Sequence, residues 1–146
     1  MIDFGFFLFE DKVFIEDDGD RITIKEYFRK EEIGKIILTV IYEPCEYELK
    51  DDFNEDFCND LFKDDMIFKI EHIEGDDDYN NLGVGKKLMK NAIYYVKKQK
   101  KSQIYLNASP IGFSGLQIKE LINFYKKFGF KVIKDQGHNA LMLLNM

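Results

Sequence analysis

Hydrophobic and polar positions alternate over short stretches in the first third of the chain, which is typical of β-strands. Apolar, β-branched segments are separated by charged turns, and an Asp-Gly pair at Asp18-Gly19 predicts a hairpin between two of them. The predicted strands of this region are residues 4–9, 12–16, 21–28 and 33–42. Pro44 ends the last strand, because proline cannot donate to a β-ladder.

A helical period replaces the alternation further along. Phe53, Phe57 and Leu61 recur at spacings of four, which predicts an amphipathic helix over residues 50–63. A second and stronger stripe predicts a helix over residues 83–98, with lysines on its other faces and at its end. Between the two helices, residues 66–73 read as another strand.

The last third predicts a strand, a helix and a closing hairpin. Residues 104–106 form the strand, which Pro110 ends, and Ser114 followed by Gln117 has the form of a capping box that opens the helix. Gly129 suits the left-handed position at the helix end. The final strands are residues 130–133 and 140–144. This order predicts an α+β fold, a single domain over residues 1–146 with a mixed, mostly antiparallel sheet flanked by helices.

Composition and charge limit the classes of function that the protein can have. A net charge of −6 gives no basic footprint for nucleic acid and favours the approach of cationic partners such as amines. No apolar run is long enough for a membrane span, and no basic segment follows Met1. Cys45 and Cys58 have the spacing of neither a disulfide framework nor a metal site, so we expect free thiols, a cytoplasmic protein and no metal.

A glycine turn precedes the helix at 83–98. In the segment Asn80-Asn81-Leu82-Gly83-Val84-Gly85, two glycines would let backbone N–H groups point at an anion beside the positive end of the helix. Lys86 and Lys87 lie in the first helical turn, where bound phosphate would explain them. The alternative is an ordinary loop with lysines in solvent. Leu88 occupies the third glycine position of a dinucleotide motif, and no phosphate-loop Gly-Lys-Ser/Thr follows.

A second motif stands at Phe124-Tyr125-Lys126-Lys127-Phe128-Gly129-Phe130. Together with the glycine turn, it resembles the GNAT family of acetyl-CoA-dependent N-acetyltransferases, over roughly residues 64 to 146. The resemblance implies an acyltransferase with acetyl-CoA as cosubstrate and an amine, on a small molecule or a protein, as acceptor.

The resemblance also implies residue roles. Backbone amides of Asn80, Asn81, Leu82, Gly83, Val84 and Gly85, with Lys86, would hold the CoA pyrophosphate, and the strand end near Ile73 would pair with the pantetheine arm. Tyr125 would protonate the leaving thiolate, which a positioned phenol can do. Its spacing equally fits an aromatic residue on the core face of a helix.

The general base stays open. Glu71, His72 and Glu74 lie on the strand beside the expected cleft, and regular alternation would place Glu71 on one face and the other two on the opposite face. Each of them also fits an ordinary strand-surface residue. His138 lies in the final turn, where we expect it in solvent.

Some positions depart from the family pattern. Asn80 replaces the usual Arg or Gln, Ile118 replaces a polar residue, and Asp76, Asp77 and Asp78 stand close to the glycine turn. A second function class therefore stays open, a weak or inactive member that binds acyl-CoA or a protein partner. The acidic stretches suit a solvated face better than a funnel for cations, and the helix at 50–63 is a candidate substrate lid or homodimer contact.

Overall fold

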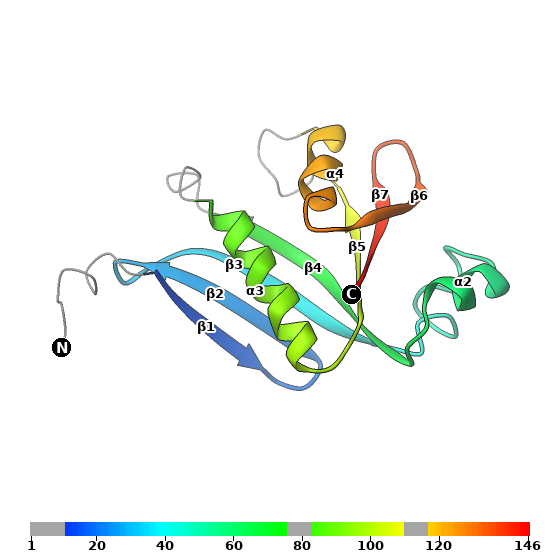
Figure 1. The fold of residues 1–146 in the computed structure, drawn as a ribbon, viewed down its shortest axis with the longest axis horizontal. Coiled ribbons are helices and arrows are strands. Elements are labelled where there is room, and N and C mark those ends of the chain that lie inside the picture. The colour runs from blue at the N-terminus through cyan, green and yellow to red at the C-terminus, as the bar shows by residue number, and fades with distance from the viewer. Residues whose placement is uncertain (1–10, 76–82, 110–116) are drawn as a thin grey trace.

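In the part of the chain that the structure describes, seven strands form one sheet, and the elements follow the predicted order (Figure 1). The computed structural model describes residues 11–75, 83–109 and 117–146. The strands are β1 (Asp11–Asp17), β2 (Arg21–Phe28), β3 (Glu31–Tyr42), β4 (Met66–Gly75), β5 (Gln103–Ala108), β6 (Lys131–Asp135) and β7 (Ala140–Asn145). The helices are α2 (Glu55–Leu61), α3 (Val84–Lys98) and α4 (Ile118–Lys126).

The strand order is β1-β2-β3-β4-β5-β7-β6, and every neighbouring pair is antiparallel except β4 with β5. The prediction of a mixed, mostly antiparallel sheet is therefore confirmed. The predicted strand at 4–9, the aspartates at 76–78, Asn80 to Leu82, Pro110 and Ser114 lie outside the described residues.

The β1–β2 hairpin forms at the predicted Asp-Gly pair. Asp17 Oδ1 accepts a hydrogen bond from the Gly19 N–H at 2.8 Å, and Asp18 Oδ1 accepts one from the Arg21 N–H at 2.8 Å. Gly19 adopts φ 99°, which favours glycine. These aspartates therefore serve the turn itself, in agreement with the preference for a solvated acidic stretch over a cation funnel.

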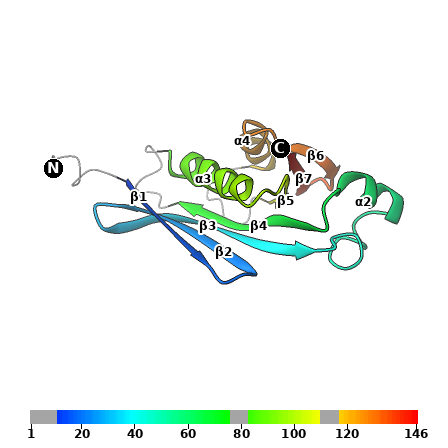
Figure 2. The ribbon, with the colours of Figure 1, turned by 60° about the horizontal axis from the view of Figure 1, so that its bottom comes forward.

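Helices α3 and α4 lie on one side of the sheet (Figure 2). The buried stripe of α3 is Val84, Leu88, Met89, Ala92 and Val96, which packs on apolar residues of β2, β3 and β4. The helix fits closely because β3 carries Gly34 beneath its first turn. None of the helices in the described ranges is long and apolar enough to cross a membrane.

Helix α4 begins later than Ser114 predicts. Its N-cap is Gln117, and the Glu120 side chain accepts a hydrogen bond from the Gln117 N–H at 3.4 Å. Gly129 follows the helix with φ 102°, as predicted for a left-handed end position. The buried face of α4 carries Leu121 and Tyr125.

The predicted helix at 50–63 is shorter than its apolar period suggests. Asn54 caps it by accepting a hydrogen bond from the Phe57 N–H at 2.8 Å, so α2 begins only at Glu55. Phe53 and Phe62 flank the helix and contribute to a second core cluster on the other face of the sheet, which includes Tyr105 of β5. Of the residues that defined the period, Phe53 belongs to this core cluster and Leu61 packs against it, whereas Phe57 lies on α2 and is exposed.

The expectation of free thiols is wrong. Cys45 and Cys58 form a disulfide with a Cα–Cα distance of 5.7 Å. Cys58 is buried on α2, and the turns between residues 43 and 54 bring Cys45 to it. The two cysteines therefore lend no support to a reducing compartment.

Candidate active site

The two parallel strands at the middle of the sheet diverge. Pairing between β4 and β5 covers Phe68 with Ile104 and ends at Ile70 with Leu106, although β4 continues to Gly75 and β5 to Ala108. Beyond Ile70, the edge of β4 that faces β5 has no strand partner in the described part of the chain. Its backbone N–H and C=O groups are therefore available to an extended ligand.

A β-bulge lies at the point of divergence. Ile37 of β3 pairs with His72 and Leu38 pairs with Ile70, so Glu71 is an extra residue without a partner in the register. The extra residue reverses the alternation of the remaining strand. Glu71, His72 and Glu74 all lie on the sheet face opposite α3, and the prediction that Glu71 lies on the other face from His72 and Glu74 is wrong.

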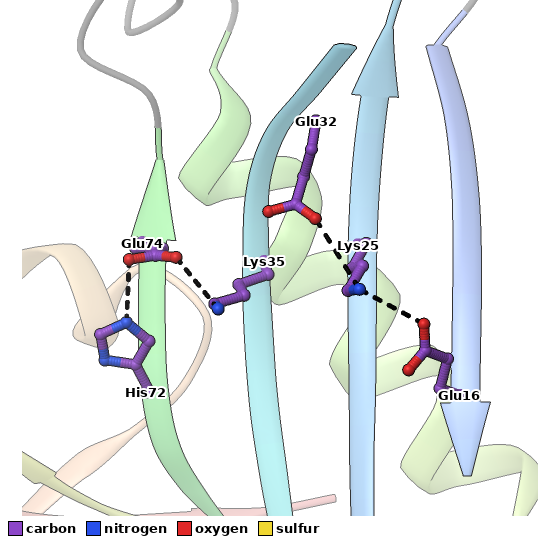
Figure 3. Close-up of polar contacts among 6 residues, drawn as sticks. All are labelled: Glu16, Lys25, Glu32, Lys35, His72 and Glu74. Carbon is purple, nitrogen blue, oxygen red and sulfur yellow. Dashed lines mark hydrogen bonds and ion pairs between the residues drawn. The ribbon is translucent and has the colours of Figure 1, made fainter. Parts of the chain in front are cut away.

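Hydrogen bonds and ion pairs confirm this shared face. Thr39 Oγ1 donates to Glu71 Oε1 at 3.1 Å, and Lys69 Nζ lies 3.2 Å from the same oxygen. Glu74 Oε2 lies 3.1 Å from His72 Nε2, while its Oε1 lies 3.4 Å from Lys35 Nζ. Figure 3 shows His72, Glu74 and Lys35 together on the near side of the sheet, with α3 behind it.

These contacts act on the charge of Glu74. The hydrogen bond with His72 lowers the pKa of the Glu74 carboxyl from its ordinary value of 4.5, and the neighbouring Lys35 ammonium lowers it further. Glu74 is therefore ionised at neutral pH and able to hold the imidazole of His72 by a charge-assisted hydrogen bond.

A cavity of about 140 Å³ opens between the diverging strands. It is lined by Ile70, Glu71, His72 and Ile73 of β4, by Leu106, Asn107 and Ser109 at the end of β5, and by Tyr125 of α4. The structure thus brings together Tyr125 and Glu71, two of the three predicted catalytic residues. The third, Glu74, reaches the cavity only through His72.

Tyr125 is buried beneath this cavity, with 4% of its surface exposed. Its ring packs edge-on against Phe124 and Phe130. Burial raises the pKa of the Tyr125 phenol well above its ordinary value of 10.0, so the hydroxyl stays protonated at physiological pH. The tyrosine is therefore a residue of the core that also lines the cavity.

The start of α3 lies close to the end of β4. Gly83 is the N-cap of α3 and has φ 68°. Because glycine has no side chain, no N-cap side chain accepts hydrogen bonds from the N–H groups of the first turn. Lys86 is exposed, whereas Lys87 Nζ lies 4.0 Å from the buried carboxylate of Glu26 on β2. The ion pair with Glu26 therefore accounts for Lys87 without a bound phosphate. Lys86 remains the candidate for binding an anion.

Gly34 is a residue of the site that sequence reasoning missed. A Cβ at this position would lie 2.6 Å from Val84 Cγ1 and 2.8 Å from the Glu74 carbonyl oxygen. Only glycine lets β3 support both the end of β4 and the first turn of α3. The sequence signal was a glycine inside an otherwise apolar strand, which marks a close approach.

The remaining predicted residues are placed as follows. The side chain of Ile73 is largely buried, and the residue lines the cavity. His138 is exposed in the β6–β7 turn, as expected. Within the described ranges, no group of three or more His, Cys, Asp and Glu could hold a metal ion.

Solved acetyltransferases share the overall fold of this chain. The PaiA N-acetyltransferase of Thermoplasma acidophilum, in complex with coenzyme A, matches 87% of this chain with a TM-score of 0.60 and 19% identity, and the match spans 62% of its own length. A GNAT family acetyltransferase of Elizabethkingia anophelis with acetyl-CoA bound has a TM-score of 0.61 and 13% identity, over 93% of this chain and 98% of that one.

The ribosomal-protein-S18-alanine N-acetyltransferase of Escherichia coli has a TM-score of 0.60 and 14% identity, over 88% of this chain and 71% of that one. No protein-family model matches the sequence, and no curated protein matches it. At these identities the likeness shows the fold, and the fold of this chain is the GNAT fold.

Proposed function

We propose that this protein transfers an acetyl group from acetyl-CoA to a primary amine on a small molecule or a protein. One observation carries the proposal: β4 separates from β5 after Ile70, and the gap opens on a cavity lined by His72 and Tyr125. Binding of acetyl-CoA or CoA to proteins of the same fold supports the choice of cosubstrate.

The residues present fit coenzyme A. The free edge of β4 at Ile73 and Glu74 offers peptide groups to the amides of the pantetheine arm, in the manner of an added strand. The first turn of α3 lies next along the same edge, where backbone N–H groups and the helix dipole favour a pyrophosphate. We assign the binding of the pyrophosphate to the following residues: Asn80, Asn81, Leu82, Gly83, Val84, Gly85 and Lys86.

The reaction needs a base and an acid on opposite sides of the thioester. The amine nitrogen attacks the carbonyl carbon, a C–N bond forms and the C–S bond breaks. We assign removal of the amine proton to His72, because an imidazole nitrogen can serve as a general base and Glu74 holds this ring in place. The Tyr125 hydroxyl then donates its proton to the departing thiolate.

Glu71 has a different role in this proposal. Its Oε1 accepts a hydrogen bond from Thr39 and forms an ion pair with Lys69. This oxygen is therefore not available to take up the proton of the amine. Its second oxygen and its charge favour a cationic acceptor at the mouth of the cavity. Glu71 therefore orients the ammonium form of the acceptor, and the proton leaves through His72.

Release of the free CoA thiol over a panel of amines tests the proposal. We expect thiol release that depends on both acetyl-CoA and one class of amine, together with a mass increase of the amine by one acetyl group. His72→Gln should lower kcat and remove the acidic limb of its pH profile, whereas the matched change His138→Gln in the exposed turn should leave both unchanged. Equal rates in the two variants would remove His72 from the mechanism.

A further inference from the structure

Among the described residues, the two edge strands of the sheet, β6 and β1, differ in how well they are protected from pairing with another strand. At one edge, β6 presents the charged residues Lys131, Lys134 and Asp135, which discourage pairing with another strand. At the other edge, β1 exposes Val13, Phe14 and Ile15 by 41%, 53% and 50%. Figure 1 shows β1 as the outermost strand of its side, beyond the strands that α3 covers.

These apolar residues occupy both faces of β1. Val13 and Ile15 lie opposite Glu26 and Ile24 in the register, on the face of α3, whereas Phe14 lies on the other face with its ring against Tyr27. An apolar edge strand with both faces exposed is a template for strand addition. A strand that pairs with β1 must therefore carry apolar side chains on both faces of its central residues.

The sequence of β1 meets this requirement in a second copy of itself. In an antiparallel pair centred on Phe14, the phenylalanines of the two copies lie opposite each other, and Val13 of each copy lies opposite Ile15 of the other. Lys12 of each copy then lies opposite Glu16 of the other. Such pairs of apolar residues and of opposite charges stabilise neighbouring strands.

The charges at the ends of β1 are placed for this pairing. Lys12 is exposed and forms no ion pair within the described part of the chain. Glu16 is exposed, and its Oε1 lies 3.3 Å from Lys25 Nζ on the inner neighbouring strand (Figure 3). One step further in either direction, Asp11 would meet Asp17, so the complementary segment is Lys12 to Glu16.

We propose that two copies of this chain associate through β1, antiparallel about Phe14, so that their sheets become continuous. The end of this strand also contacts α3, because Tyr95 donates a hydrogen bond to Asp17. Strands β2 and β3 separate β1 from the gap at β4, so both cavities stay open in the dimer. A single strand pair buries less than the roughly 1,200 Å² of stable interfaces, so the dimer is reversible and depends on concentration.

Sedimentation equilibrium across a wide range of protein concentration tests this dimer. The wild-type protein should move from monomer to dimer as concentration rises. Lys12→Glu and Glu16→Lys should each weaken association at least tenfold, because each places like charges opposite each other twice per dimer. The double variant Lys12→Glu/Glu16→Lys should restore it, since the complementary pairs return with reversed signs.

Matched variants distinguish this edge from other surfaces. Lys131→Glu on the β6 edge and Phe57→Glu on exposed α2 should leave the association unchanged. Phe14→Cys should crosslink two copies rapidly under mild oxidation, because opposite Cβ atoms lie about 4.5–5.5 Å apart in such pairs, whereas Lys90→Cys on α3 should not.

Three results would overturn the proposal. The first is a wild-type protein that stays monomeric at every concentration. This result would count against the proposal even if a variant that lacks residues 1–10 formed a dimer. The second is an association that ignores the charge reversals at Lys12 and Glu16. The third is an association lost in Phe57→Glu, which would place the contact on α2.

Discussion

Gly34→Ala tests how β3 positions the candidate site. The added methyl carbon would lie 2.6 Å from Val84 Cγ1, 2.8 Å from the Glu74 carbonyl oxygen and 3.1 Å from Leu88 Cδ1. The carbonyl belongs to the strand backbone and Val84 begins the helix, so relief of the overlap must move β4 or the first turn of α3. Overpacking of this kind costs about 1–3 kcal/mol of unfolding free energy.

Chemical denaturation and acetyl-CoA titration of the same variant measure the two consequences. We expect the unfolding free energy to fall by about 2 kcal/mol, and the affinity for acetyl-CoA to fall because the two displaced segments are those assigned to the cofactor. Gly75→Ala is the matched control. Gly75 lies directly opposite Gly34, yet its added carbon would lie 3.6 Å from Val84 Cγ1, an ordinary contact.

The reasoning would be refuted if Gly34→Ala kept both its stability and its affinity, or if Gly75→Ala lost as much of either. A loss of stability with unchanged affinity would leave the packing argument intact but remove the link between Gly34 and the cofactor.

Further predictions concern the cavity, the disulfide and the charge network. Tyr125→Phe should lower kcat by about a hundredfold or more and leave the KM for acetyl-CoA unchanged; an unchanged kcat in steady-state kinetics would remove the general acid. Replacement of both Cys45 and Cys58, separated by 13 residues, by Ser should lower the unfolding free energy by about 3 kcal/mol, and wild-type protein in reductant should match the variant in urea denaturation. Equal stability would contradict a structural disulfide. Because the pKa of Glu74 is lowered, its ionised form stabilises the fold above pH 4.5, and this contribution is lost as pH falls through the lowered value. NMR titration should find a midpoint below 4.5 that rises in His72→Gln, and a midpoint at 4.5 in both proteins would contradict the hydrogen bond.

Much of the fold follows from local signals in the sequence. The Asp18-Gly19 pair sets the first hairpin through hydrogen bonds to neighbouring N–H groups, and Gly129 ends α4 because it adopts a positive φ. The apolar stripe of α3 matches its buried face. Each of these features depends on residues that are close together in the sequence, so a short segment is enough to predict it.

The parts that the sequence did not predict depend on distant partners. The bulge at Glu71 is defined by the register of β3 against β4, and regular alternation therefore placed Glu71 on the wrong face. Cys45 and Cys58 approach each other only because the turns before α2 bring them together. Gly34 matters because of a helix that begins fifty residues later in the chain, at Val84.

Binding of acetyl-CoA, located by hydrogen exchange, tests the central claim most directly. We expect acetyl-CoA to protect backbone amides of β4 after Ile70 and of the first turn of α3, and to add about 2.7 kcal/mol of stability at one hundred times its dissociation constant. Gly85→Glu, which places a carboxylate beside the expected pyrophosphate, should abolish both effects. Protection elsewhere in the chain, or no stabilisation at millimolar acetyl-CoA, would contradict a cofactor site in the gap between β4 and β5.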